Sequence, residues 1–562
     1  MNVNRPPFPK IQTPRDIEML AQRVGMKYGA FGSRPPEEEA DERVLADSFF
    51  RPTVQIIAGV FVASLLAFFL QAPTFDVDGW ANKPRLDTAL ILFWGPALFW
   101  AMARQRLWKS LRVYLVLCLF IESFSEAMFR EMGEGGYWDT VMWPSAVAWF
   151  GTLKEFAGVP GASLSTFFFV TVGLLYRAVW GKKPDTWTAP PKFATRAMHV
   201  FLVTILVLAI VGVVRGGQID WTFRQTIHLL QLPLVAILFL YALRVPEDLA
   251  AVGTAFVTAA VVRSVLVGFV YFAICMPAGI TSLPGKPEWC TNHSDTVLFV
   301  TALMILLAHA LEQRKRRVTW RALGLSAIIL AGVVLNNRRL AFVSLAAASL
   351  IVYLALKPSK RKRRVTVAIA VLVPLLAGYV LIGSDIPSQS AFLKPAKIIV
   401  SVLEQKDASA LSRDIENENL IYTLRQAPAY VFTTGFGHEY QFAPEHPPVD
   451  LGETFRNFRL IAHNGVLWIW SVAGVVGFTL LWIVYPLGGT LAVRGYRAAQ
   501  SPLERTAALG ALGAIVVCVS QIWGDQGFNS YMTLITFSVA FAIAARLAVR
   551  PQGVYAQQET NA

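Results

Sequence analysis

The sequence predicts an all-α fold: a polytopic transmembrane helical bundle of about 14 spans (range 12–14), with one long outer loop of short helices. Of the 562 residues, 55% are hydrophobic and 16% are charged. A soluble domain carries about 25% charged residues. Apolar runs of about 20 residues, the length that crosses a bilayer core as a helix, recur along the chain. This composition argues against a water-soluble enzyme.

Fourteen apolar runs supply the predicted spans. The segment 139–157 is also apolar, but Pro144 interrupts it and Lys154 and Glu155 lie within it, so we expect an interfacial or re-entrant helix there. The predicted spans are 53–71, 88–103, 111–128, 162–180, 198–214, 226–243, 250–274, 294–311, 321–336, 340–356, 365–383, 465–485, 506–523 and 529–548.

The positive charge predicts the orientation of these spans. The formal net charge is +14. With the N-terminus inside, about two thirds of the 51 lysines and arginines fall in inner segments, as the positive-inside rule requires. Both termini are therefore expected in the cytoplasm. Residues 1–50 are polar and contain RPPEEEADER, which is unlike a cleavable signal peptide.

Sorting the chain by hydropathy gives five parts. The longest extramembrane piece is the outer loop 384–463, and loops longer than about 15 residues are usually functional or disordered. A water-facing site is expected in this loop. The parts are a cytoplasmic tail (1–52), N-terminal transmembrane helices (53–289), a region with the outer loop (290–485), C-terminal transmembrane helices (486–548) and a second cytoplasmic tail (549–562).

Arg338 and Arg339 break the charge rule. The stretch LNNRRLAF places them in a short turn between two spans on the outer side, where positive charge is depleted. Guanidinium groups bind phosphate through two parallel hydrogen bonds, which favours a phosphate site. The alternative is that both arginines extend toward lipid phosphates.

His463 and Asn464 open a span in the stretch AHNGVLWIW, at the water boundary. Histidine titrates near neutrality and can act as a base, although a lone histidine beside a span is more often a hydrogen-bonding group. In the preceding loop, SRDIENENLIYTLRQ predicts an amphipathic helix, and Gly435 and Gly437 supply a flexible turn after it. One face of that helix carries Arg413, Asn417, Leu420 and Leu424.

Other polar residues lie near the outer ends of spans. His293 and Asp295 open the span 294–311. Glu122 and Glu126 share a helix face, and they either line a polar cavity or pair with Arg263 of the span 250–274. Two cysteines flank one outer loop and form either a disulfide or two unrelated thiols; they are Cys275 and Cys290.

These motifs occur in a recognisable order. An arginine turn (NNRRLAFVSLAAASLIVYL) is followed by a long outer loop with RDIEN and GFG, and then by a span that begins HNGVLWIWSVAGVVG. Over residues 290–485 this pattern resembles the O-antigen ligase and O-antigen polymerase family.

The resemblance implies an enzyme of the bacterial inner membrane. Members transfer a glycan from undecaprenyl pyrophosphate to a sugar hydroxyl on the periplasmic side; ligases use lipid A core as the acceptor and polymerases use another lipid-linked repeat unit. The implied roles are His463 as general base, Arg338 and Arg339 stabilising the departing pyrophosphate, and Arg413 and Asn464 orienting the substrates.

Direct displacement would invert the anomeric carbon. No cofactor or metal is expected, and no nucleic-acid partner. Besides the donor, the acceptor and membrane lipids, the resemblance suggests a polysaccharide chain-length regulator as a partner.

The sequence departs from the family pattern at two places. The family turn usually reads Ser-Arg-Gly, whereas this chain has Asn-Arg-Arg-Leu, so either arginine could be the equivalent one. A second phosphate-binding arginine usually precedes the span corresponding to 294–311, where this chain offers only a lysine. The candidates for that contact are Lys286, Arg215, Arg224 and Arg263, and the further substrate-binding candidates are His293, Asp295 and Glu126.

Two other classes of protein compete with this interpretation. A transporter or flippase of lipid-linked oligosaccharides would suit the span count, with Glu122, Glu126 and Arg263 as a midplane site. A structural membrane subunit would leave the arginine turn unexplained. Between polymerase and ligase, the large number of spans slightly favours a polymerase.

Overall fold

The structure is a computed structural model. It describes residues 53–60, 62, 107–121, 149–150, 165–181, 189–243, 246–275, 294–312, 316–336, 338–385, 396, 400, 408–426, 434–446, 459–525 and 527–549, all within one compact unit, Thr53–Ala562. Every regular element in these residues is a helix, and nine of their helices are long and apolar enough to cross a membrane. The all-α polytopic fold is therefore confirmed.

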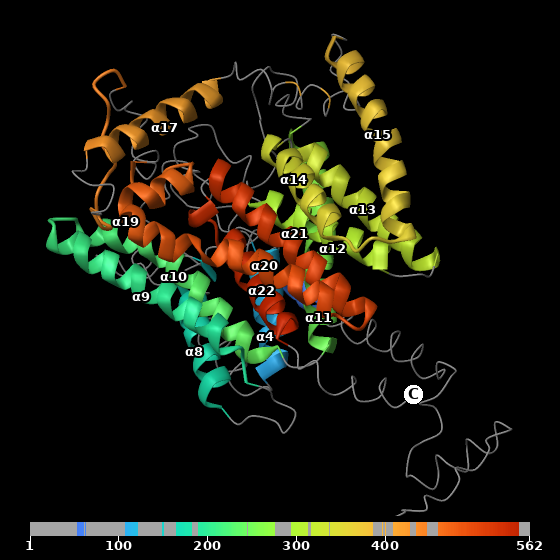
Figure 1. The fold of residues 1–562 in the computed structure, drawn as a ribbon, viewed down its shortest axis with the longest axis horizontal. Helices are drawn as coiled ribbons and strands as arrows, with labels where there is room; N and C mark the ends of the chain where they lie inside the picture. Colours follow the sequence, from blue (N-terminus) through green and yellow to red (C-terminus); the bar gives the residue numbers. More distant parts are fainter. Residues whose placement is uncertain are drawn as a thin grey trace, which may run out of the picture. The chain divides into compact units, whose positions relative to one another are not determined.

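The helices follow one another through mostly short connections (Figure 1). A π-helical turn, η2 (Val270–Cys275), extends α11, and a 3-10 turn, η4 (Gly527–Asn529), precedes α22. In chain order the α-helices are α4 (Leu107–Phe120), α8 (Thr166–Trp180), α9 (Lys192–Val214), α10 (Ile219–Ala242), α11 (Pro246–Phe269), α12 (Asp295–Glu312), α13 (Arg316–Asn336), α14 (Arg339–Ala355), α15 (Lys360–Asp385), α17 (Ala408–Gln426), α19 (Gly465–Trp482), α20 (Val484–Ala498), α21 (Pro502–Gly524) and α22 (Tyr531–Ala548).

Local sequence explains where several helices begin. Ser501 and Glu504 form a capping box at the start of α21, with Pro502 in its first turn. Such a box satisfies backbone N–H groups that have no partner within the helix. Ser530 caps α22 by its side chain alone: its hydroxyl accepts from the Thr533 N–H at 3.3 Å.

The helices lie over the predicted spans with one notable difference. The predicted spans 53–71 and 88–103 fall mostly or wholly outside the described residues, as does most of 139–157. The difference concerns the span 465–485, because the helical stretch continues through α19 and α20 to Ala498. At about 1.5 Å per residue, 34 helical residues exceed the thickness of a bilayer core.

The stretch from Gly465 to Ala498 is broken rather than straight. Gly474 has φ 63° and ψ −178°, which interrupts α19, and Ile483 separates α19 from α20. Only glycine adopts this backbone conformation without steric cost. α19 packs mainly against α9 and α17 and less against α21, whereas α20 packs extensively against α21 and α22. The two helices therefore serve different parts of the molecule.

The core of the bundle is built around α21 and α22, which contact each other and α10, α12, α14 and α20. Small residues let the helices approach closely. A side chain added at Gly513 of α21 would place its Cβ 2.7 Å from the Met304 side chain of α12. Glycine at such positions permits close helix packing in membranes, where hydrophobic exclusion between helices is weak.

Two ends of the bundle can be distinguished by the residues that meet there. At one end Leu340 of α14 lies against Gly524, and Gly465 lies against Ile522. We call this the His463 end. At the opposite end the Arg505 Nε donates to Glu312 at 2.6 Å. Positive-inside orientation predicts that the His463 end faces outward.

A buried ion pair joins three helices. Arg263 of α11 and Asp295 of α12 are each 1% exposed, and the Arg263 Nε lies 2.6 Å from the Asp295 Oδ1. The Arg263 Nη1 also donates to the carbonyl of Phe120, the last residue of α4, at 2.9 Å. A charge buried at this depth requires its partner, because breaking such a pair leaves an uncompensated charge.

We expect single substitutions in this pair to destabilise the protein strongly. Arg263→Met or Asp295→Leu should each cost about 3–5 kcal/mol, whereas the double variant should recover most of the loss because no charge remains buried. Thermal unfolding in detergent measures the three variants. A double variant as unstable as the sum of the singles would show that the ion pair is not the source of the loss.

Candidate active site

His463 lies directly before α19, in a segment that the helix cap fixes. The Oδ1 of Asn464 accepts from the backbone N–H of Leu467 at 3.2 Å and so caps the helix. Asn464, which the resemblance assigns to substrate orientation, therefore has a structural task as well. The His463 side chain is 23% exposed, so its ring is accessible from outside the protein.

The carboxylate of Glu416 contacts both the backbone and the ring of His463. Glu416, on α17, is 7% exposed. Its Oε2 accepts from the His463 backbone N–H at 3.0 Å, and its two oxygens lie 3.1 and 3.2 Å from the ring Nδ1. An ionised carboxylate only accepts hydrogen bonds, so a neutral ring carries its proton on Nδ1. The Nε2 of His463 is then the proton-accepting nitrogen.

The end of α21 contacts three other parts of the candidate site: α17, the start of α14 and the start of α19. Asp525, directly after α21, lies with its Oδ1 3.6 Å from the Nη2 of Arg413 on α17. The start of α14 and the start of α19 both pack against the last residues of α21, through Gly524 and Gly465. The end of α21 therefore brings the arginine turn, α17 and the His463 segment to one place.

The arginine turn is as short as predicted. Arg338 is the residue before α14, and Arg339 is the first residue of the helix. The Nε and Nη2 atoms of Arg338 are buried inside the protein. Of the two adjacent arginines, Arg338 thus holds part of its guanidinium group within the bundle at the His463 end.

The GFG motif docks onto the membrane helices by direct backbone contact. Gly435 and Gly437 have φ values of 78° and 96°. Phe436 between them is fully buried, and its carbonyl oxygen would lie 1.7 Å from a Cβ added at Gly212 of α9. The Gly435 N–H donates to the Val472 carbonyl at 3.2 Å, close to the kink of α19. The motif is therefore a fixed anchor rather than the flexible turn that the sequence predicted.

Gln225 of α10 locks this anchor to the His463 segment. Its side chain is 1% exposed. The Oε1 accepts from the Gly437 N–H at 2.6 Å, and the Nε2 donates to the carbonyls of His438 at 3.0 Å and Leu460 at 2.7 Å. One amide thus joins two parts of the loop that are about twenty residues apart in sequence.

The remaining predicted residues are placed as follows. Asp295 is engaged with Arg263 in the buried pair described above. Arg215 follows the last residue of α9, and Arg224 pairs with Asp220 one turn away on α10 at 3.2 Å, both at the His463 end. His293, Lys286, Glu126, Glu122 and Cys290 lie outside the described residues, so their predicted roles, and the two alternatives for Cys275 and Cys290, stay predictions.

Sequence reasoning missed three residues that build the site: Glu416, Asp525 and Gln225. Glu416 is part of the quoted RDIEN motif, one turn after Arg413 on the predicted helix, so its position was visible although its partner was not. Asp525 and Gln225 stand near span ends without any neighbouring motif. Only the folded chain connects them to the loop.

Metal-ligating side chains do not cluster in the part of the chain that the structure describes. No group of three His, Cys, Asp or Glu residues there is arranged to hold a metal ion. The described cysteines with free thiols are Cys118 and Cys518, both buried.

The fold and the candidate site together define a polytopic membrane protein in which a docked loop, α17 and the start of α14 meet at one end of the bundle. Residues 324–482 match the family model described as O-antigen ligase, which runs from within α13 to the end of α19. This segment is thus similar to the O-antigen ligase/polymerase family, a class that carries out glycan transfer in membranes. A search of curated proteins found no match.

The close contact at Gly212 makes a sharp prediction. Gly212→Ala should displace Phe436, because the added methyl would overlap its carbonyl oxygen, and overpacking of this kind costs about 1–3 kcal/mol. We expect faster proteolysis within residues 434–446, mapped by mass spectrometry in proteoliposomes.

The matched control is Gly324→Ala on α13, where nothing lies within 4 Å of the added Cβ. That variant should keep the wild-type cleavage pattern. Equal cleavage of all three proteins would contradict the assigned anchor.

Proposed function

We propose that the protein transfers a glycan from undecaprenyl pyrophosphate to an acceptor sugar hydroxyl on the periplasmic face of the bacterial inner membrane. The reaction either polymerises repeat units or ligates O-antigen to lipid A core. The Glu416–His463 contact is the observation that carries the proposal, because it prepares a base with a defined proton-accepting nitrogen. The family match over residues 324–482 supports the reaction class.

In the proposed step, the Nε2 of His463 takes the proton of the acceptor hydroxyl. The acceptor oxygen then attacks the anomeric carbon of the donor sugar, while the bond from that carbon to the pyrophosphate oxygen breaks. One displacement inverts the configuration at the anomeric carbon. Glu416 stabilises the imidazolium that forms and keeps the ring oriented, since its carboxylate contacts Nδ1 and the backbone N–H.

The departing undecaprenyl pyrophosphate develops negative charge, and Arg338 is proposed to stabilise it. Its guanidinium group has a permanent charge, and the Nε and Nη2 atoms of that group are buried. Arg339 and Arg413 add positive charge at the same end of the bundle. The ion pair of Arg413 with Asp525 at 3.6 Å holds Arg413 near the end of α21, which supports the orienting role proposed for it. Such preorganised charge acts on the leaving group without prior rearrangement.

A flippase would need an alternating path for its cargo and no base. The buried carboxylate that orients an accessible imidazole favours chemistry at this end of the bundle over transport through it. The two functions also differ in product, because only transfer forms a new glycosidic bond.

We expect His463→Ala to lower the turnover number of glycan transfer by about 10²–10⁴-fold, the usual contribution of a general base. Glu416→Gln should be comparably impaired, since a carboxamide can donate to Nδ1 and so place the ring proton on Nε2. The measurement is product formation by the purified protein in proteoliposomes with its lipid-linked donor, together with surface glycan in complemented cells.

Glu418→Gln is the matched control for these variants. Glu418 is on the same helix, is 59% exposed at its side chain, and pairs with His446 rather than with His463. It should retain near-wild-type transfer. Normal polymer from His463→Ala would refute the assigned base.

Arg338→Lys and Arg339→Lys test which arginine contacts the leaving group. Losing one preorganised charge donor typically costs about 10²–10³-fold in turnover. We expect Arg338→Lys to show the larger loss, because a lysine ammonium does not reproduce a partly buried guanidinium. Single-turnover assays at saturating donor compare the two variants. A larger loss in Arg339→Lys would reverse the assignment.

A further inference from the structure

Two aromatic rings and an arginine form a cluster on the docked loop, beside the proposed base. The ring centroids of Tyr440 and Phe442 are 5.1 Å apart, and the guanidinium carbon of Arg459 lies 5.7 Å from the centre of the Phe442 ring. All three side chains are partly exposed. We call Tyr440, Phe442 and Arg459 the aromatic cluster. The proposed transfer step uses none of them.

The backbone that carries the aromatic cluster is held from α17. The Thr423 hydroxyl accepts from the Gln441 N–H at 2.7 Å, and the Asn419 Oδ1 accepts from the Ala443 N–H at 2.9 Å. Both helix residues are nearly buried. The rings therefore stand on a backbone that is ordered before any ligand arrives, which lowers the entropy cost of binding.

The aromatic cluster is close to the Glu416–His463 pair. The Tyr440 N–H donates to the Arg459 carbonyl at 3.3 Å, which joins two segments of the loop. His463 is the fourth residue after Arg459, at most roughly 14 Å away along an extended chain. Glu416 is also near enough to Tyr440 to act electrostatically on its phenol. A short oligosaccharide can reach from one to the other.

The chemistry of the aromatic cluster suits a saccharide. The flat, partly exposed rings can pack against the apolar C–H faces of sugar rings, and Tyr440 adds a polar phenol at its edge. Burial, and next the charge of Glu416, raise the pKa of that phenol. Tyr440 is therefore a protonated hydrogen-bond donor at physiological pH. An arginine beside the rings adds donors for sugar hydroxyl or acidic groups.

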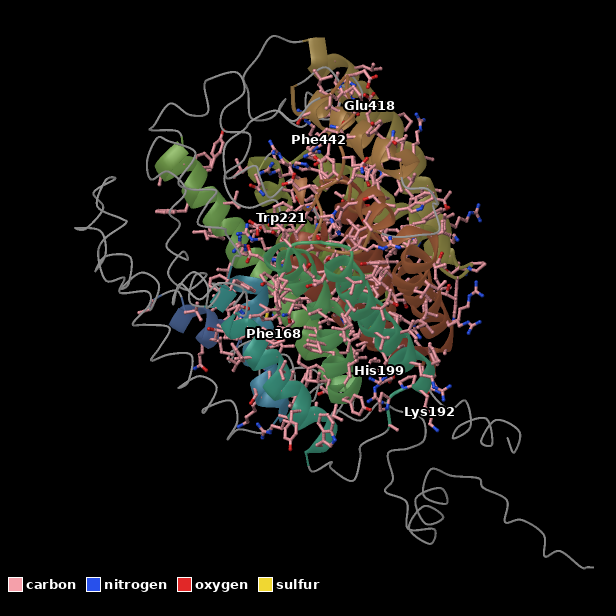
Figure 2. The ribbon with its side chains drawn as sticks, turned by 90° about the vertical axis from the view of Figure 1, so that its left-hand side faces the viewer. Phe168, Lys192, His199, Trp221, Glu418 and Phe442 are labelled. Carbon is pink, nitrogen blue, oxygen red and sulfur yellow. The ribbon has the colours of Figure 1, made fainter. Side chains whose placement is uncertain are left out.

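The position of the aromatic cluster favours binding of the acceptor rather than of the donor. The arginine turn contacts α21 through Leu340, on the side where the proposed leaving group binds. The loop that carries the aromatic cluster is instead fixed to α9, α10 and α17. Figure 2 places Phe442 with Glu418 at the end of the bundle opposite Lys192 and His199. The accepting hydroxyl must approach His463, and the aromatic cluster lies on the approach from the loop side.

We propose that Tyr440, Phe442 and Arg459 form the binding subsite for the acceptor saccharide, where its non-reacting sugar residues pack while one hydroxyl is presented to His463. The inference rests on the proposed glycan transfer and deepens it. The saccharide comes either from a lipid-linked repeat unit or from lipid A core.

The test measures binding and transfer separately on the full chain in detergent. The probes are the repeat-unit oligosaccharide released from the donor lipid by mild acid, and delipidated core oligosaccharide, each followed by saturation-transfer NMR. The wild type should bind one of the two, and the one it binds identifies the source of the acceptor. Phe442→Ala and Tyr440→Ala should each weaken binding about tenfold or more, with KM for acceptor rising far more than KM for donor.

The conservative variant Tyr440→Phe keeps the ring and loses only the phenol, so we expect a smaller, severalfold loss with an unchanged fold. Phe223→Ala, which removes an exposed aromatic side chain of α10, is the control and should bind normally. His463→Ala should bind the oligosaccharide while failing to transfer.

The outcomes separate the two proposals. Wild-type binding by both Tyr440→Ala and Phe442→Ala would overturn the subsite even if His463→Ala is inactive. The subsite would also be overturned if the wild type bound neither of the two probes. Conversely, full transfer by His463→Ala with weakened binding in the ring variants would sink the assigned base and leave the subsite standing.

Discussion

The contact between Phe436 and Gly212 is the constraint on which the site depends. A loop can lie against membrane helices only where its backbone polar groups find partners and nothing intervenes. Gly212 has no side chain that would separate α9 from the backbone of Phe436. Gln225 supplies three hydrogen bonds to the loop. Once the loop is docked, α17 and the His463 segment are held relative to each other, and Glu416 can meet the imidazole.

Buried polar groups recur at the points where helices must be fixed. Arg263 and Asp295 join α11 and α12, and Glu312 accepts from Arg505 and from the Tyr496 hydroxyl at the opposite end. Each pair is specific, because a buried charge without its partner is costly. Of these contacts, the Arg263–Asp295 pair is the more deeply buried, with both side chains 1% exposed, whereas the Arg505 side chain at the opposite end is 26% exposed.

The family match and the site do not cover the same residues. The matched segment 324–482 holds the arginine turn, Glu416 and His463, yet the residues that fix them include Gly212, Gln225 and Asp525, which lie outside it. The segment alone therefore does not make the site. The helices before and after it supply the surface against which the loop packs, so the candidate site requires the whole bundle.

The sequence by itself predicted the spans that the structure describes, the short arginine turn, the helix α17 and the place of His463 before α19, because apolar length, charge and helical periodicity are local properties. The tertiary structure alone decided that Glu416 meets His463, that Arg413 meets Asp525, and that helix continues through α20. Those partners are far apart in the chain, and no spacing encodes their contact. The glycines of GFG predicted a turn from sequence alone. That this turn anchors the loop depends on Gly212 of α9, which packs against Phe436 in the folded chain.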